Sequence, residues 1–429
     1  MPTIYILDVT NRDGVQTSRL GLAKLEKTMI NVYLNEMGVH QSEFGFPYTF
    51  HEMNYINANL ELAARGELQP MILSGWCPAR ESEIELSFTG TSLRHISVSI
   101  STSEQMTKGK FGGRVVRTPE EGPDVMNLID MMLKGVELAR KHGAITVGVN
   151  AEDASRTDDE LLLRFARAAK EAGADRFRFC DTLGYCDPLT IYERVRMLAE
   201  EVGLPMEMHC HNDLGMAVAC SVAGAKGAVD GGVNAYINTA VNGMGERAGN
   251  ADLVSVILAV KKSSGLEGQY VLDERVDLSK AWKIAKYASY AFGVPIPVNQ
   301  VGVGDNAFAH EAGIHADGAL KDRRNYELYN YEELGRGDPE IIETGRQITC
   351  GEYSGIKGFR DVYGKLEIEF RSDEEAREIL ELARFANVHT QKPLTEDELR
   401  FIARHPDLAR RIMTMTPLER PGQEGKKQK

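Results

Sequence analysis

Two histidines spaced two positions apart carry the clearest chemical signal in this sequence. They lie in the stretch His209-Cys210-His211, directly after a short apolar run that reads as a β-strand. Successive side chains of a strand point to opposite faces, so His209 and His211 leave the same face. Neutral imidazoles placed side by side can hold one divalent metal ion. The alternative is that both are polar residues at a strand end that hydrogen-bond locally.

Oxygen ligands for the same ion follow two other expected strands. Asp13 comes after the first strand of the sequence, and Asn250 comes after the last one. One carboxylate oxygen with two imidazole nitrogens suits a borderline divalent cation that keeps positions open for substrate oxygens. Arg12 cannot lose its proton, so beside a metal ion it is a fixed donor for an oxyanion. The alternatives are a cap or an ion pair with Arg12 for Asp13, and a surface salt bridge for Arg12.

Further polar side chains follow other strands. Glu152 comes after the fifth expected strand and is a candidate general acid or base, or a residue that orients its neighbours. Arg80 and Thr182 follow the third and sixth strands. His310 and His315 lie beyond the last strand, where a histidine in a helical region is usually structural.

These residues fall at the ends of a regular series of expected elements. Eight short strands are each followed by a helical pattern, at a spacing of roughly thirty residues, which is typical of a (β/α)8 TIM barrel. The expected strands cover residues 4–7, 41–47, 71–74, 95–100, 144–150, 176–180, the run that ends in the two histidines, and 235–238. In such a barrel the C-terminal strand ends form one rim, and active sites lie there. A doubly wound open sheet is the alternative fold.

The alternation of strands and helices stops near residue 278. Helical patterns and a Gly-rich loop make up the sequence that follows. We therefore expect an α/β barrel over residues 1–275 and a mainly helical C-terminal region over 276–429.

The composition is that of an ordinary globular protein. The chain has 429 residues, 42% of them apolar and 26% charged, with a formal net charge of −13. This charge argues against nucleic acid or an anionic membrane as the main partner. We find no apolar run of membrane-spanning length and no secretory signal. The six cysteines form no C-x-x-C pair, which indicates reduced thiols in the cytoplasm.

Three longer motifs resemble the signatures of the DRE-TIM metallolyases. They are residues 11–16 (Asn-Arg-Asp-Gly-Val-Gln), 209–215 (His-Cys-His-Asn-Asp-Leu-Gly) and 242–250 (Asn-Gly-Met-Gly-Glu-Arg-Ala-Gly-Asn). Within that superfamily the chain is similar to the enzymes that condense acetyl-CoA with 2-oxo acids, namely isopropylmalate, homocitrate, citramalate and Re-citrate synthases. The similarity continues through residues 307–315. The first motif departs from the usual pattern at Asn11 and Val15, where Leu and Glu are common.

The resemblance implies a metal-dependent condensation followed by thioester hydrolysis. The 2-oxo acid would chelate a divalent metal ion, with Mn2+ expected and Mg2+, Co2+ or Zn2+ as alternatives. The implied metal ligands are Asp13, His209, His211 and Asn250. Arg12 would stabilise the charge that develops on the keto oxygen.

The resemblance also implies how acetyl-CoA is activated and how the chains associate. Glu152 or His315 would help to remove a proton from the methyl group of acetyl-CoA. In this family the segment after the barrel commonly reaches the site of a neighbouring subunit. We therefore expect a homodimer in which His310 and His315 act on the partner's site.

Departures from the family narrow the substrate. Homocitrate synthases carry an arginine on the fifth strand that grips the distal carboxylate of 2-oxoglutarate, and Gly148 stands at that position here. We expect Gln16, Asn150 and Thr182 to bind the 2-oxo acid and Arg80 to meet the distal carboxylate of a shorter diacid. Oxaloacetate, condensed to citrate, is therefore the expected substrate.

Other functions stay open on the sequence alone. Homocitrate and isopropylmalate synthases are the alternatives within the same class. A lyase of the superfamily that runs the retro-aldol direction is another, and a non-catalytic metabolite sensor belongs to a different class.

Overall fold

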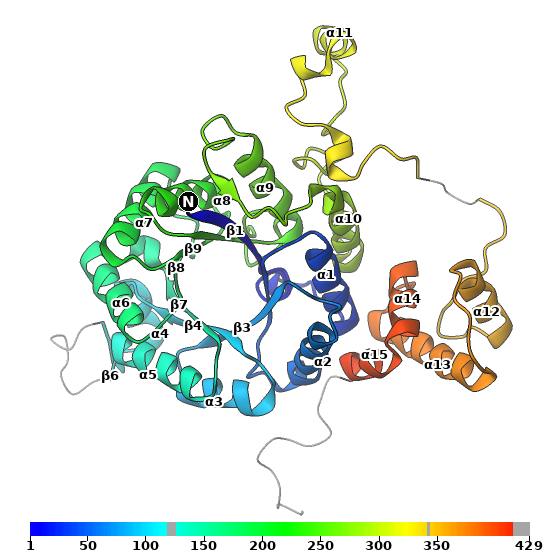
Figure 1. Cartoon of the computed structure of the whole chain (residues 1–429), viewed down its shortest axis with the longest axis horizontal. Helices are drawn as coiled ribbons and strands as arrows, with labels where there is room; N and C mark the ends of the chain where they lie inside the picture. Colours follow the sequence, from blue (N-terminus) through cyan, green and yellow to red (C-terminus); the bar gives the residue numbers. More distant parts are fainter. Residues whose placement is uncertain (118–125, 341–343, 415–429) are drawn as a thin grey trace, which may run out of the picture.

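Eight parallel strands close into a barrel in the computed structural model, which describes residues 1–117, 126–340 and 344–414 (Figure 1). Each strand pairs with its neighbours in the sequence, and the last pairs with the first from Ile4–Ala235 to Asp8–Thr239. This closure confirms the predicted TIM barrel and excludes the open sheet. The barrel strands are β1 (Thr3–Asp8), β2 (Gln41–Gly45), β3 (Ile72–Pro78), β4 (His95–Ser101), β7 (Thr146–Glu152), β8 (Arg176–Asp181), β9 (Met206–Cys210) and β10 (Ala235–Thr239).

A ring of helices surrounds the barrel. Its members are α1 (Lys24–Glu36), α2 (Met53–Ala64), α3 (Glu81–Gly90), α5 (Leu128–Lys141), α6 (Asp159–Glu171), α7 (Pro188–Val202), α8 (Ala217–Asp230) and α9 (Leu253–Lys262). Several begin at side-chain caps: Asn127, Asp158 and Asp187 each accept a hydrogen bond from a backbone N–H of the first turn. None of the described helices is long and apolar enough to cross a bilayer.

The strands alternate between an apolar outer face and a polar inner face. Outward side chains form the hydrophobic core with the helices, and they include Ile4, Ile6, Phe44, Leu73, Ile96, Val98, Val147, Val149, Phe177, Phe179, Met206, Met208 and Ile237. The opposite face carries Glu43, Ser97, Arg178, Glu207 and Asn238, which contact one another across the barrel interior. A TIM barrel interior is commonly filled by Val, Ile and Leu. Here charged side chains fill it, and they lie directly below the functional rim.

Some short elements were not predicted. Helix α4 (Glu104–Phe111) and the two-stranded sheet β5 (Val115–Val116) with β6 (Met126–Asn127) are inserted between β4 and α5. A ninth strand, β11 (Val271–Leu272), pairs with the start of β1. Strand β7 begins at Thr146 rather than 144 and runs to Glu152, so Asn150 lies inside the strand and Glu152 ends it.

The C-terminal region is helical, as predicted. Helix α10 (Ala281–Phe292) packs against α1, and α15 (Pro406–Met413) packs against α2. Helices α13 (Asp373–Thr390) and α14 (Glu396–Arg404) pack against α15, and α12 (Ile356–Lys365) packs against α13.

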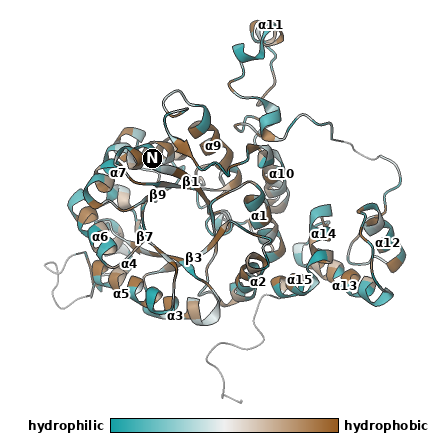
Figure 2. Cartoon of the chain, viewed as in Figure 1, coloured by the Kyte–Doolittle hydropathy of each residue, from teal (hydrophilic) through white to brown (hydrophobic). Residues whose placement is uncertain are grey.

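One segment of this region stands apart from its own barrel. Helix α11 (Gly313–Lys321) lies at the end of an arm that points away from the ring of helices in Figure 1. It buries no residue, although it carries apolar side chains (Figure 2). Ile314 and Leu320 are 79% and 89% exposed.

Candidate active site

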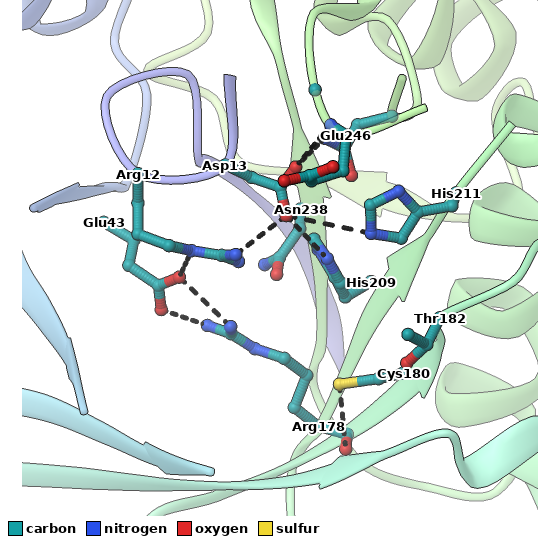
Figure 3. Close-up of polar contacts among 12 residues, drawn as sticks. Arg12, Asp13, Glu43, Arg178, Cys180, Thr182, His209, His211, Asn238 and Glu246 are labelled. Atoms are coloured by element: carbon teal, nitrogen blue, oxygen red, sulfur yellow. Dashed lines mark hydrogen bonds and ion pairs between the residues drawn. The ribbon is translucent and has the colours of Figure 1, made fainter. Parts of the chain in front are cut away.

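Asp13, His209 and His211 meet at the C-terminal rim of the barrel (Figure 3). Asp13 lies in the loop after β1, whereas His209 is in β9 and His211 follows it directly. The Nε2 atoms of His209 and His211 are 3.5 and 3.7 Å from Oδ2 of Asp13. All three side chains are buried, and one ligand atom of each lies within 4.8 Å of the others. Within the described residues, no other group of three or more His, Cys, Asp or Glu side chains converges in this way.

The protonation states of these residues suit a cation. Burial lowers the pKa of both histidines, that of His211 to about 4, and the neighbouring His209 adds to the effect on His211. Burial alone would raise the pKa of Asp13, but the charge of Arg12 and the contact with His209 outweigh it and hold the pKa well below its ordinary value. At neutral pH the site therefore offers two neutral imidazoles and one carboxylate. This donor set fits a borderline divalent metal ion.

Asn250 completes the cluster. Its Nδ2 lies 2.9 Å from Oδ1 of Asp13, and its Oδ1 is buried without a hydrogen-bond partner among the described residues. Rotation of the amide would turn that oxygen toward Asp13, because the two ends of an amide have the same shape. A Cβ on Gly245 would lie 2.0 Å from Nδ2 of Asn250 and 2.9 Å from Oδ1 of Asp13. The glycine of the third motif is therefore needed for the two side chains to approach each other.

Arg12 is held on two sides at the edge of this cluster. Its Nη1 donates to Oδ2 of Asp13 at 2.8 Å, and its Nε donates to Oε1 of Glu43 at 2.7 Å. The guanidinium lies 5.8 Å from the ring centre of Trp76. A permanent positive charge thus stands beside the candidate metal ligands, where it can stabilise an oxyanion.

A cavity of about 230 Å³ opens over the cluster. Its lining residues are Arg12, Asp13, Gln16, Trp76, Ser99, Asn150, Glu152, Arg178, Cys180, Thr182, His209, His211, Glu246 and Arg247. Asn150 is only 1% exposed, and neither end of its amide has a partner among the described residues. Buried polar groups are normally hydrogen-bonded, so this amide is placed to bind a ligand. A larger surface groove of about 740 Å³ lies beside α2 and contains none of the candidate metal ligands.

Glu152 and Thr182 line the cavity on the side of α4 and β8. The carboxylate of Glu152 accepts hydrogen bonds from Ser101 Oγ and Lys110 Nζ. The hydroxyl oxygen of Thr182 accepts from the backbone N–H of Asp153 at 2.9 Å. Its own hydrogen is therefore available to an acceptor in the cavity.

The remaining predicted residues divide into two groups. Gln16 ends the 3-10 turn after Asp13 and lines the cavity. Arg80 precedes α3, is exposed, and pairs with Glu83 at 3.3 Å outside the cavity lining. His310 lies 3.3 Å from Oε1 of Glu327 and His315 packs on Tyr326, both on the arm. The single chain therefore brings Gln16 to the cavity, but not Arg80 or either arm histidine.

Sequence reasoning missed the charged groups beneath the cavity. Glu43 and Arg178 lie within strands that were expected, and they occupy the face opposite to their apolar neighbours. The available signal was an acidic or basic residue alternating with apolar ones in a strand of a barrel, because such a residue must point into the interior. Lys110 was missed because it belongs to the inserted helix α4.

Comparison with known proteins identifies the family. The model of the HMGL-like family matches residues 3–287, which span the barrel and part of α10. The chain belongs to the HMGL-like family. A second family model, homocitrate synthase post-HMGL domain-like, matches residues 303–390, which begin before the arm and end with α13. The resemblance seen in the three motifs is thus confirmed.

Three relatives are similar over nearly their whole length. The chain is 59% identical to the citrate (Re)-synthase of Dehalococcoides mccartyi, covering 97% of this chain and 99% of the relative. It is 37% identical to 2-isopropylmalate synthase 2 of Caldanaerobacter subterraneus subsp. tengcongensis, covering 93% and 94%. It is 32% identical to homocitrate synthase 1 of Nostoc sp., covering 93% and 96%.

Solved structures agree on the fold. The hydroxymethylglutaryl-CoA lyase of Pseudomonas aeruginosa matches with a TM-score of 0.54 and 17% identity, covering 69% of this chain and 95% of the lyase. At this identity the likeness concerns the barrel fold alone.

Proposed function

We propose that the protein condenses acetyl-CoA with oxaloacetate and releases citrate and CoA, as a (Re)-citrate synthase. The 59% identity to a citrate (Re)-synthase, over nearly the full length of both chains, carries this proposal. The buried Asp13–His209–His211 cluster beneath an open cavity supports it, because a 2-oxo acid is a chelating ligand for a metal ion.

Asp13, His209 and His211, joined by Asn250, would hold one divalent cation. We favour Mn2+ because the oxygens that Asp13, Asn250 and a chelating substrate would supply suit it better than Co2+ or Zn2+, whereas the two imidazoles suit it better than Mg2+. When bound, the ion supplies Lewis-acid polarisation of the keto group of the substrate. Asn150, Gln16 and Thr182 would hold the carboxylates of that substrate by hydrogen bonds from the cavity wall.

Arg12 would act on the keto oxygen. Its guanidinium is fixed 2.8 Å from Asp13, beside the position where a chelated keto oxygen would lie. Negative charge grows on that oxygen when a carbon nucleophile attacks the keto carbon. A guanidinium held in place before the reaction stabilises this charge without reorganisation.

Glu152 would remove the proton from the methyl group of acetyl-CoA. Its carboxylate stands at the cavity wall, where Ser101 and Lys110 hold it. Loss of the proton leaves an enolate, whose methylene carbon forms the new bond to the keto carbon of oxaloacetate. Water then cleaves the thioester to give citrate and free CoA. His315 of a second copy is the alternative base.

We further propose a homodimer in which the arm completes the partner's site. Helix α11 exposes Ile314 and Leu320 and lies away from its own cavity, so a second copy is the natural partner for this surface. Tyr185, in the loop between β8 and α7, and Leu189, in the first turn of α7, are 63% and 75% exposed and offer a receiving surface, because this loop begins at Thr182 of the cavity lining. Such docking would carry His310 and His315 toward the partner's cavity.

The preference for oxaloacetate rests on the cavity wall. Gly148, two positions before the cavity residue Asn150 on β7, has no side chain that could grip the distal carboxylate of 2-oxoglutarate, and a Cβ at this position would lie 3.1 Å from Ser97 Oγ. Asn150 offers an uncharged amide, where an arginine would offer a positive charge. Arg80 would need to leave Glu83 to reach a distal carboxylate.

The six cysteines are free and buried, which suits a reducing compartment. This supports our proposal of a cytoplasmic enzyme.

A substrate panel tests the proposed function. The purified protein with Mn2+ and acetyl-CoA is offered oxaloacetate, 2-oxoglutarate, 2-oxoisovalerate and pyruvate, and release of free CoA is followed with a thiol reagent. We expect the highest kcat/KM with oxaloacetate and citrate as the product. Preference for 2-oxoglutarate or 2-oxoisovalerate would identify a homocitrate or isopropylmalate synthase. If no oxo acid leads to CoA release, the remaining functions are a lyase of the superfamily and a non-catalytic metabolite sensor.

A further inference from the structure

Arg178 lies at the bottom of the cavity and is only 1% exposed. It points into the barrel from β8 toward Glu43 of β2 (Figure 3), and Glu207 of β9 contacts it as well. Its Nη1 and Nη2 lie 3.2 and 2.6 Å from Oε1 and Oε2 of Glu43, which makes a two-pronged contact. Its Nε donates to Oε1 of Glu207 at 2.6 Å.

Glu43 is shared between Arg178 and Arg12. Oε1 accepts from Nε of Arg12 at 2.7 Å and from Nη1 of Arg178 at 3.2 Å, whereas Oε2 contacts Arg178. Arg12 therefore holds Glu43 by one nitrogen only and reaches Asp13 with Nη1. No hydrogen bond to the described residues involves its Nη2, which leaves this nitrogen for a ligand.

A carboxylate with two free oxygens would hold Arg12 differently. Arginine and carboxylate prefer two parallel hydrogen bonds, and this geometry is stronger than a single contact. If Oε2 of Glu43 were released, Arg12 would take both oxygens through Nε and Nη2, the two nitrogens whose hydrogens point to the same side of the guanidinium. Nη1 would stay on Asp13, but Nη2 would be occupied and lost to a ligand in the cavity.

We propose that Arg178 is a positioning residue for the condensation, because by occupying Oε2 of Glu43 it keeps Nη2 of Arg12 free to donate to the reacting keto oxygen. The proposal rests on the proposed function for its kinetic consequences. Arg178 itself is not a substrate ligand, since its guanidinium nitrogens already face Glu43, Glu207 and Ser97. The effect reaches the reacting atoms only through Glu43 and Arg12.

The test compares R178M with R176M in the full-length protein. Arg176 is a matched control, because it is buried two positions earlier on the same strand and also pairs with Glu207, with Nε 3.2 Å from Oε2. It contacts Gln41 rather than Glu43. Both variants should lose thermal stability, because each leaves a buried carboxylate with one partner fewer. Only R178M should lose kcat, by about 100-fold, since a small misplacement of a catalytic group costs this much.

A double-mutant cycle separates positioning from general damage. In an R12A background, R178M should have no further effect on kcat, because the group it positions is gone. R178K, whose ammonium cannot make the two-pronged contact with Glu43, should have a kcat between those of R178M and wild type, and it replaces R178M in the cycle if R178M does not fold. The crystal structure of either variant should show Arg12 bound to both oxygens of Glu43.

Three results would overturn the proposal. They are equal losses of kcat in R178M and R176M, an undiminished effect of R178M in the R12A background, and a variant structure in which Arg12 still holds Glu43 by Nε alone. If the wild-type protein releases no CoA with any oxo acid, the proposed function fails instead. The position of Arg12 in the variant structure still tests the positioning role in that case.

Discussion

Replacement of Arg12 by alanine should separate catalysis from metal binding. In the structure Arg12 contacts Asp13 through Oδ2, the oxygen that also lies nearest to the two imidazoles. Asp13 keeps other support after the change, because the backbone N–H of Glu246 donates to Oδ1 at 3.2 Å. The ligand cluster should therefore survive in R12A.

The magnitudes follow from these contacts. Loss of one preorganised donor to a developing oxyanion lowers kcat by about 100- to 1,000-fold, or about 3–4 kcal/mol. Metal affinity should stay the same or become tighter by up to about tenfold, because a positive charge next to the ligand oxygen opposes a cation. Glu43 stays neutralised by Arg178, so the fold should be retained.

The assay measures both quantities on the same samples. CoA release at saturating substrates gives kcat, and titration of the metal-free protein with Mn2+, followed by electron paramagnetic resonance of the free ion, gives the affinity. R12K serves as the control that keeps the charge but loses the two-sided contact with Asp13 and Glu43. A parallel loss of kcat and metal affinity in R12A would refute the reasoning, because it would make Arg12 a structural support of the ligands.

Three further predictions follow from the site and the core. Removal of metal with EDTA should abolish CoA release, and Mn2+ should restore it; activity that persists in metal-free protein would contradict the assignment. Asn150→Ala should raise the KM for the 2-oxo acid by about tenfold, the worth of a buried hydrogen bond, with unchanged metal affinity; a changed metal affinity with an unchanged KM would move Asn150 out of the substrate site. Burial raises the pKa of Asp8 from 3.8 to about 7. Below pH 3.8 the carboxyl is protonated in both the folded and the unfolded chain, and its full contribution to stability is present. As the pH rises through 7 this contribution is lost, because the unfolded chain ionises more easily than the folded one. Asp8→Asn keeps the acceptor for Thr10 N, so in urea unfolding at pH 8 it should be more stable than wild type by at most about 4 kcal/mol, and the gain should shrink toward pH 5. A gain in stability that does not change with pH would show that the ionisation of Asp8 is not its cause.

The barrel was predictable because its pattern repeats. Eight short strands separated by helical patterns leave few other solutions, and the closure between β1 and β10 follows from the count of strands. The insertion after β4 was not predictable in this way, because α4 and the short β5–β6 pair break the repeat. Only tertiary contacts, such as that of Lys110 with Glu152, show where the insertion lies.

The ligand cluster was predictable for a different reason. His209 and His211 share a strand face by simple alternation, and Asp13 joins them because all strands of a barrel end on one rim. The contact of Glu43 with Arg178 could not be derived, since it joins strands on different sides of the barrel. The structure places His310 and His315 on an arm away from the cavity of their own chain, and their action on the site of a second copy stays a prediction.

The most direct measurement is a crystal structure of the protein grown with Mn2+, with anomalous scattering recorded to locate the ion. We predict one strong peak at the C-terminal rim, within about 2.4 Å of the Asp13 carboxylate and of Nε2 of both His209 and His211. A peak elsewhere, or an ion bound without these three residues while CoA release is intact, would contradict the account.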